Sequence, residues 1–286
     1  MTSKNTLLPV QTMLQSRGRL LDLSQPVIMG ILNATPDSFY NKGRESSLAE
    51  LIANAERMLK AGATILDIGG ATTKPGSEII DVDEELKRVM PVVESIYKEY
   101  PDVWISVDTY HSKTAKETVY AGASIINDVS SGRFDNEMMA TVAALKVPYI
   151  AMHMQGTPMN MQNDPVYNDV VNEVRDELRK TCDQYQRAGI VDIIVDPGFG
   201  FGKTVEHNLS LLNNLHTLRI LGRPILAGIS RKSMICKVLK VNPEHALNGT
   251  TALHMVALQQ GANILRVHDV KEGIEVIKLY EQLSAV

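Results

Sequence analysis

The stretch AGATILDIGG at residues 61–70 sets the pattern of this chain: a glycine, a short run of aliphatic residues, and then residues that can do chemistry. Three other stretches repeat this pattern: AGASIINDVS at 121–130, AGIVDIIVDPG at 188–198 and GANILRVHDV at 261–270. Runs without apolar/polar alternation are typical of strands buried on both faces of a parallel sheet. Each glycine is predicted to end a helix in the left-handed conformation that glycine adopts most easily.

Eight such apolar runs occur along the chain, and each ends at a polar residue or a glycine. They cover residues 27–32, 64–68, 103–107, 124–126, 147–152, 191–195, 225–229 and 262–265. The segment before Gly62 has the three-and-four spacing of a helix with one apolar face, and Ser46 or Ser47 is a plausible N-cap. The repeating unit is therefore a helix, a tight turn and a buried strand.

Eight units joined by right-handed crossovers predict an α/β fold, a (β/α)8 TIM barrel. A length of 286 residues suits a single barrel domain, which we expect over residues 25–286. Residues 1–24 precede the repeat as an N-terminal extension. Within it, residues 14–24 are expected to form a hairpin that covers the bottom of the barrel.

The composition argues against several kinds of partner. A net charge of −4 and a pI near 6.0 give no basic stripe for nucleic acid or an anionic membrane. Cys182 and Cys236 lack metal-ligand spacing and favour a reducing compartment. No run of about 18 apolar residues and no signal-like segment is present. We therefore expect a soluble cytoplasmic protein that binds neither nucleic acid nor membrane.

Three polar residues follow three different predicted strands: Asp108, Asn127 and Asp196. Each one alone is about as well explained as a cap on the following helix. A barrel would bring all three to one rim, where catalytic residues of this fold lie. Carboxylate and amide groups together suit a flat heterocycle with donors and acceptors, such as an aminopyrimidinone edge.

The last two predicted strands are followed by basic residues. Arg231 and Lys232 follow one strand, and Arg266 and His268 occur at the end of the other. The loops after the last two strands commonly bind phosphate in this fold. Ser233 is expected to start a helix whose N-terminal amides favour an anion.

The glycine-rich stretch DPGFGFGK at 196–203 does not have the spacing of a nucleotide-binding loop. It is predicted to be a tight turn that either exposes Phe199 or Phe201 at the rim for stacking or buries the ring beneath the loop. His153, at the end of another strand, is more simply explained as a packed or loop-bracing residue than as a metal ligand.

Taken together, the motifs resemble those of the dihydropteroate synthases, over almost the whole chain and in family order. The matching stretches are LDLSQPVIMGILNATPDSF (21–39), DIGGATTKPG (67–76), WISVDT (104–109), IINDVSS (125–131), MHMQGTP (152–158), DPGFGFGK (196–203), SRKSMI (230–235) and ILRVHDV (264–270). The resemblance implies a transferase of folate biosynthesis, and a sulfonamide target, that joins 4-aminobenzoate to a dihydropterin diphosphate.

The resemblance also implies roles for individual residues. Asp108, Asn127 and Asp196 would hold the pterin edge, with Lys232 beside the ring. The diphosphate and its Mg²⁺ would be held by Asn33, Arg266 and His268, with Asn33 reaching the metal. The 4-aminobenzoate position would be bordered by Thr73, Pro75, Phe201, Lys232 and Ser233. Lys232, Arg266 and His268 are the expected catalytic residues.

Two loops, residues 34–46 and 71–81, are expected to close over the site because they have little apolar anchoring. They depart from the family pattern at Tyr40, Asn41, Ala71 and Lys74. A homodimer is expected from the resemblance, and the Met- and Leu-rich face of residues 245–260 is compatible with it or with core packing. The alternatives are a pterin-dependent methyltransferase domain, which needs a corrinoid partner, and a non-catalytic pterin-binding protein.

Overall fold

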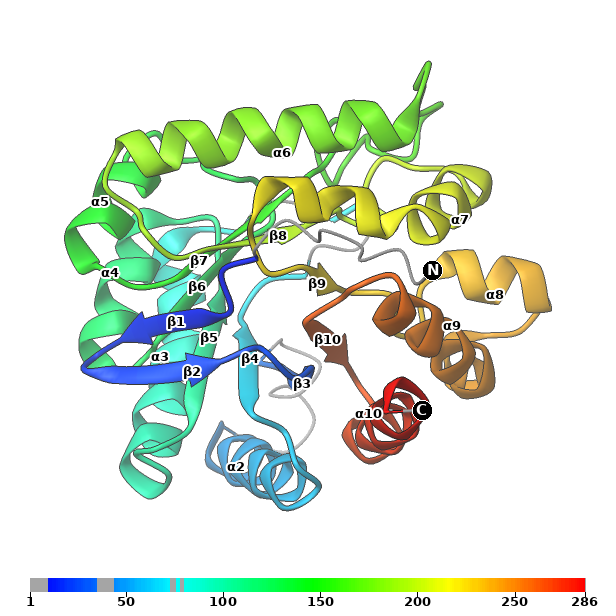
Figure 1. The fold of residues 1–286 in the computed structure, drawn as a ribbon. Coiled ribbons are helices and arrows are strands. Elements are labelled where there is room, and N and C mark those ends of the chain that lie inside the picture. Colours follow the sequence, from blue (N-terminus) through cyan, green and yellow to red (C-terminus); the bar gives the residue numbers. More distant parts are fainter. Residues whose placement is uncertain (1–9, 35–43, 73–75, 78–79, 286) are drawn as a thin grey trace.

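The computed structural model describes residues 10–34, 44–72, 76–77 and 80–285. Within them, eight parallel strands form a barrel with helices on its outside, as predicted (Figure 1). The strands are β3 (Val27–Asn33), β4 (Ile65–Gly69), β5 (Trp104–Asp108), β6 (Ile125–Asp128), β7 (Tyr149–Met152), β8 (Ile193–Asp196), β9 (Leu226–Ala227) and β10 (Ile264–Val267). The α-helices are α2 (Arg44–Lys60), α3 (Val82–Glu99), α4 (Ser112–Ala121), α5 (Met138–Leu145), α6 (Val170–Arg187), α7 (Val205–Asn213), α8 (Ser233–Leu239), α9 (Leu247–Gln259) and α10 (Val270–Ser284). Two 3-10 segments are η1 (Leu215–Leu221) and η2 (Pro243–His245).

The sheet runs in the order β8-β7-β6-β5-β4-β3-β10-β9, and every neighbouring pair is parallel. A bridge between Val195 and Ile225 joins its two ends, and Val195 N donates to Pro224 O at 2.9 Å. The barrel is therefore nearly closed. Strand β9 is shorter than the predicted run of residues 225–229, and Pro224, which cannot donate to a sheet, lies just before that run.

The interior of the barrel is layered. Alternate strands each place a fully buried isoleucine in one apolar cluster, which we call the isoleucine layer: Ile65, Ile125, Ile194 and Ile264. Two residues further along the same strands come Asp67, Asn127, Asp196 and Arg266, which we call the polar layer. Because side chains two apart on a strand share a face, the polar layer lies directly above the isoleucine layer, toward the carboxyl ends of the strands.

Helix ends follow the predicted glycine signals. Gly62, Gly122, Gly189 and Gly261 all have positive φ, between 95° and 132°. At Gly122 a Cβ would lie 2.4 Å from Tyr97 Cγ, so space as well as conformation requires glycine there. The expected N-cap at Ser46 or Ser47 was wrong. Helix α2 already begins at Arg44, and Ser47 is buried within it.

An N-terminal hairpin closes the bottom of the barrel, as predicted. Strands β1 (Met13–Ser16) and β2 (Arg19–Asp22) are antiparallel and lie across the front of the barrel strands in Figure 1. The two turn residues between them, Arg17 and Gly18, both have positive φ, as tight hairpin turns require. Leu14, Leu21 and Leu23 pack in the same cluster as the isoleucine layer.

In the part of the chain that the structure describes, no helix combines the length and the apolar character needed to span a bilayer.

Candidate active site

The carboxyl ends of the barrel strands, which we call the mouth, hold a connected polar network. Arg266 on β10 donates through Nε to Asp67 Oδ2 at 2.6 Å and through Nη2 to Asp108 Oδ2 at 2.9 Å. Asn127 Nδ2 on β6 donates to the same Asp67 Oδ2 at 3.1 Å. Four strands therefore contribute to a single network, and three of its members were predicted from the sequence.

Asp196 and Lys232 form a second group on the other side of the mouth. Asp196 Oδ1 accepts from Gly198 N at 2.7 Å. Lys232 Nζ donates to the carbonyl oxygen of Phe199 and lies 4.6 Å from the centroid of the Phe201 ring. Phe199 is fully buried, whereas Phe201 is partly exposed, so only Phe201 is available to contact a ligand at the rim.

Burial and crowding shift the acid–base properties of these groups. Burial raises the pKa of Asp108 to about 7; Arg266 opposes the rise, while the nearby carboxylates Asp67 and Glu85 add to it. Burial also raises the pKa of Asp196, although Lys232 counteracts it. For Lys232, burial lowers the pKa to about 8. Several groups with shifted pKa values gathered at one end of a barrel are typical of active sites.

Arg266 remains a permanent cation. Burial would lower its pKa, but the charges of Asp67 and Asp108 raise it well above the usual value. Its guanidinium also acts on the second group, because its charge lowers the pKa values of both Asp196 and Lys232. The two groups therefore share one electrostatic environment, in which Asp67, Asp108 and Asp196 face two cations.

His268 and Ser233 lie at the outer edge of the mouth, and both are exposed. His268 Nδ1 lies 3.0 Å from Ser230 Oγ. Partial burial, together with the charge of Arg266, lowers the pKa of His268 to about 4, so the ring is neutral near pH 7. Ser233 begins α8, as predicted.

Arg231 does not add to the cationic side of the mouth as expected. Its guanidinium makes two hydrogen bonds to Asp269, at 2.7 and 2.8 Å, and donates to the carbonyls of Pro243 and Glu244. The charge is thus neutralised within the protein. Arg231 connects the loop after β9 to the loop after β10 and to η2.

The loop at 196–203 is fixed from behind by a buried lysine, whose pKa burial lowers to about 7. Lys203 Nζ donates to the carbonyls of Gly198 and Phe201, at 2.9 and 3.0 Å, and lies 2.9 Å from His153 Nδ1. On its other side, His153 Nε2 is 3.2 Å from Glu177. His153 therefore braces the loop, one of the two readings that the sequence left open.

Of the remaining predicted site and loop residues, the structure describes only some. Asn33 is the exposed last residue of β3, at the mouth. Thr73 and Pro75 lie outside the described residues, as do most of the two predicted loops, including Tyr40, Asn41 and Lys74. Ala71 packs against a small apolar cluster at the mouth that includes Phe201.

Sequence reasoning missed two buried carboxylates. Asp67 has no exposed surface, and a signal for it existed: the tripeptides ILD, IIN, IVD and ILR occur at the same place on four alternate strands. Glu85, on α3 behind Asp108, is also fully buried and accepts from Thr109 Oγ1 at 2.6 Å. In the sequence it is indistinguishable from an exposed acidic residue in the first turn of a helix.

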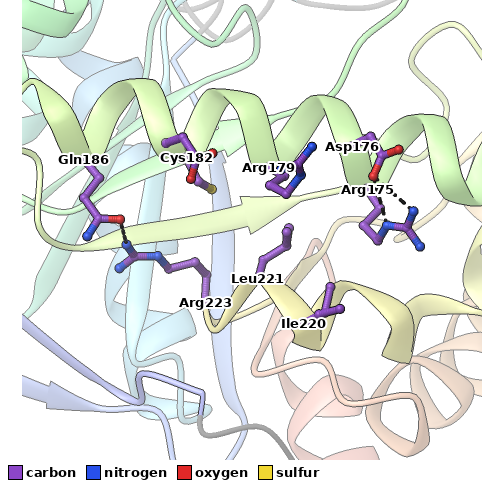
Figure 2. Close-up of a pocket in the computed structure, with 9 residues that line it drawn as sticks. Arg175, Asp176, Arg179, Cys182, Gln186, Ile220, Leu221 and Arg223 are labelled. Atoms are coloured by element: carbon purple, nitrogen blue, oxygen red, sulfur yellow. Dashed lines mark hydrogen bonds and ion pairs between the residues drawn. The ribbon is translucent and has the colours of Figure 1, made fainter.

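A groove of about 530 Å³ between α6 and η1 is not the candidate site (Figure 2). Two of its arginines already have protein partners: Arg223 donates to Gln186 at 3.0 Å, and Arg175 pairs with Asp176 at 3.0 Å (Figure 2). The groove is lined by helix surfaces rather than by strand ends, where this fold places its active sites.

Comparisons with known proteins identify the class of enzyme. The model of the pterin binding enzyme family matches residues 29–268, a span that includes the whole polar layer. The chain therefore belongs to the pterin-binding barrel enzymes.

Individual relatives narrow this assignment. Dihydropteroate synthase from Escherichia coli K12 is 45% identical over 268 residues, which cover 93% of this chain and 94% of the relative. The Yersinia pestis enzyme, solved with a sulfonamide drug, has 42% identity and a TM-score of 0.91, with 96% of this chain and all of that chain covered. The Xanthomonas albilineans enzyme, solved with 7,8-dihydropteroate, has 39% identity and a TM-score of 0.86, with 96% and 99% covered. The chain belongs to the dihydropteroate synthases, transferases of folate biosynthesis.

Proposed function

We propose that the mouth of this barrel condenses (7,8-dihydropterin-6-yl)methyl diphosphate with 4-aminobenzoate, giving 7,8-dihydropteroate, diphosphate and a proton. The observation that carries this proposal is the polar layer, in which amide, carboxylate and guanidinium groups form one buried network on an apolar base. The related Xanthomonas albilineans enzyme was solved in one structure with 7,8-dihydropteroate and in another with 4-aminobenzoic acid. These complexes support the same chemistry here.

The pterin would be held by Asp108, Asn127 and Asp196. The carboxylates accept hydrogen bonds from the ring N–H groups, and each such charge-assisted bond contributes about 1.5 to 3 kcal/mol. Lys232 lies beside Phe201 and near Asp196, where its ammonium can donate to the ring from the opposite side. The isoleucine layer closes the bottom of the pocket and excludes water.

The diphosphate would be bound at the outer edge, by His268 and by Ser233, the exposed first residue of α8. His268 is neutral near pH 7, and its neutral imidazole still carries one N–H that can donate to the diphosphate. Arg266 supplies permanent positive charge from below, with Nη1 free of any partner among the described residues.

Mg²⁺ fits this site as a metal held mainly by the substrate. Asn33 offers an amide oxygen, a ligand type that Mg²⁺ accepts, and the described residues contain no cluster of three metal-ligating His, Cys, Asp or Glu side chains. Mg²⁺ commonly takes one or two protein ligands and completes its shell with phosphate oxygens and water. When bound, the ion neutralises negative charge on the departing diphosphate.

In the reaction, the bond between the pterin methylene carbon and the diphosphate oxygen breaks, and a carbon–nitrogen bond to the arylamine forms. The arylamine is neutral at physiological pH and needs little help from a base. The main demand is therefore to stabilise the positive methylene as the anion leaves. Asp108, one of three buried carboxylates at the mouth, supplies negative charge for this once it is ionised. Lys232, Arg266 and His268 are the proposed catalytic residues.

The oligomeric state and location are further parts of the proposal. Three large apolar side chains on the adjacent helices α7 and α8 are exposed, namely Leu209, Val238 and Leu239. They support a homodimer formed through this face. On α9, Leu253, Met255 and Val256 pack partly against the core, which accounts for much of the Met- and Leu-rich pattern. We place the enzyme in the cytoplasm because its substrates are soluble metabolites.

The test is diphosphate release by the purified protein from the dihydropterin diphosphate, with and without 4-aminobenzoate and Mg²⁺. Release that requires both and accompanies dihydropteroate formation supports the proposal. Pterin binding without release would indicate a non-catalytic binder. Methyl transfer with a corrinoid protein would indicate the methyltransferase alternative.

A further inference from the structure

We infer that Asp67 is a positioning residue for the pterin site: its carboxylate fixes the orientation of the Asn127 amide and holds the guanidinium of Arg266. This inference rests on the proposed function, because it assumes that Asn127 and Arg266 face the bound substrate. Asp67 itself has no exposed surface and lies in the middle of the mouth network rather than at its edge.

The orientation of Asn127 follows from hydrogen-bond chemistry. An ionised carboxylate only accepts, so the group that Asn127 turns toward Asp67 Oδ2, 3.1 Å away, is its NH₂ group. The amide oxygen of Asn127 then points away from Asp67, and it accepts no hydrogen bond from any described residue. Asn127 therefore keeps its acceptor oxygen available to the ligand, which suits a ligand edge that carries an N–H donor at this position.

The position of Arg266 depends on the same oxygen atom. Asp67 Oδ2 accepts from Arg266 Nε at 2.6 Å, and Asp108 Oδ2 accepts from Nη2 at 2.9 Å. Two carboxylates on neighbouring strands thus fix the plane of the guanidinium. Without Asp67, Arg266 keeps only the contact to Asp108, and the planar fork can rotate about it.

Asp67 contacts two members of the polar layer but not the third. It bonds Asn127 and Arg266, whereas Asp196 bonds Gly198 N. This difference gives a matched control inside the same layer. A change at Asp67 should couple more strongly to a change at Asn127, which Asp67 contacts, than to a change at Asp196, which it does not contact.

The experiment is a pair of double-mutant cycles, with the dissociation constant for 6-hydroxymethylpterin measured by calorimetry. Asp67→Ala is expected to weaken binding by about tenfold to a hundredfold, the usual cost of leaving buried polar groups unpaired. In an Asn127→Ala background the same change should cost at least about fivefold less. In an Asp196→Ala background the cost of the same change should stay closer to its cost in the wild type than it does in the Asn127→Ala background.

A conservative variant separates positioning from stability. Asp67→Asn retains an acceptor oxygen for both partners, so it should recover most of the affinity lost in Asp67→Ala. Thermal unfolding of each variant reports any general damage. Additive effects in both cycles, or Asp67→Asn binding as weakly as Asp67→Ala, would overturn the inference. Absence of pterin binding by the wild type would instead count against the proposed function.

Discussion

The two ends of the barrel use charged residues in opposite ways. At the bottom, which the hairpin closes, Arg19 donates to the carbonyls of Pro101 and Val103 and to Ser124 Oγ, and it lies 5.3 Å from the Trp104 ring. Asp192 accepts from the backbone N–H of Gln15 at 2.8 Å. Both of these charged residues therefore have protein partners at this end.

At the mouth, by contrast, carboxylates are crowded together, and the pKa values of Asp108 and Asp196 are raised. Asp67, Asp108 and Asp196 share two cations, and burial raises the pKa of Asp108 to about 7. Such an arrangement costs stability, because buried like charges repel each other. The contrast indicates that the bottom of the barrel stabilises the fold. The mouth lowers the folding stability, because it keeps charged groups close together where a ligand can contact them.

The largest expected effect is on ligand binding at the mouth. Asp196→Asn should weaken pterin binding by about a hundredfold or more, since it replaces the charged acceptor that we propose for the ring N–H groups. Calorimetric titration with the pterin measures it. The control at the bottom is Asp192→Asn, which should leave pterin affinity unchanged and lower the melting temperature. Unchanged affinity in Asp196→Asn would remove this residue from the pterin site.

The next effect is on stability at the bottom. Leu23→Ala removes a fully buried side chain beneath the isoleucine layer and should lower the free energy of unfolding by about 3 kcal/mol. Denaturant unfolding measures this loss, and kcat/KM measured well below the melting temperature should stay within about twofold of the wild type. A large fall in kcat/KM with intact folding would contradict the division between the two ends.

The third effect is a pH dependence at the mouth. If ionised Asp108 stabilises the departing methylene as proposed, kcat/KM should fall about tenfold per pH unit below the free-enzyme pKa of about 7. This acid limb should be absent from the pH profile of Asp108→Asn, whose overall activity should be low. A wild-type profile that is flat between pH 5.5 and 8 would exclude this role for Asp108.

The raised pKa of Asp108 also predicts how the folding stability changes with pH. Its pKa is higher in the folded state than in the unfolded state, so its contribution to stability is fully present below about pH 4 and is lost as the pH rises through about 7. Asp108→Asn lacks this loss. Between pH 5 and pH 8 the free energy of unfolding of Asp108→Asn should therefore rise by about 2 kcal/mol relative to that of the wild type. Melting temperatures of both proteins at the two pH values measure this change.

The smallest effect concerns His268. His268→Ala should weaken binding of the dihydropterin diphosphate, and turnover, by about tenfold, because one neutral hydrogen-bond donor to the anion is lost. Affinity for the pterin without its diphosphate should stay the same, and comparing the two ligands isolates the contribution. Full activity of this variant would remove His268 from the mechanism.

Much of this architecture could be predicted because each element has a local cause. The apolar runs specify strands, the glycines at 62, 122, 189 and 261 specify helix ends, and residues 14–24 specify the hairpin. Asp108, Asn127, Asp196, Lys232 and Arg266 were found because they lie at the carboxyl ends of strands or directly after them, where the fold places active sites.

The sequence-based predictions failed for residues whose partners leave no signal, or only an ambiguous signal, in the neighbouring sequence. Arg231 looks like Lys232 in the sequence, yet it pairs with Asp269, 38 residues away. Glu85 resembles a surface residue, yet α3 packs it behind Asp108. Such pairings depend on loop paths and helix packing, which the spacing of residues along the chain does not specify.

The sequence by itself determined the strands, their order, and the residue types that each strand brings to the mouth, because the two-residue period of a strand fixes which side chains face inward. Only the tertiary structure decided which of those side chains bond each other. One oxygen of Asp67 joins Arg266 and Asn127, 199 and 60 residues away, because closure of the barrel brings alternate strands into one layer.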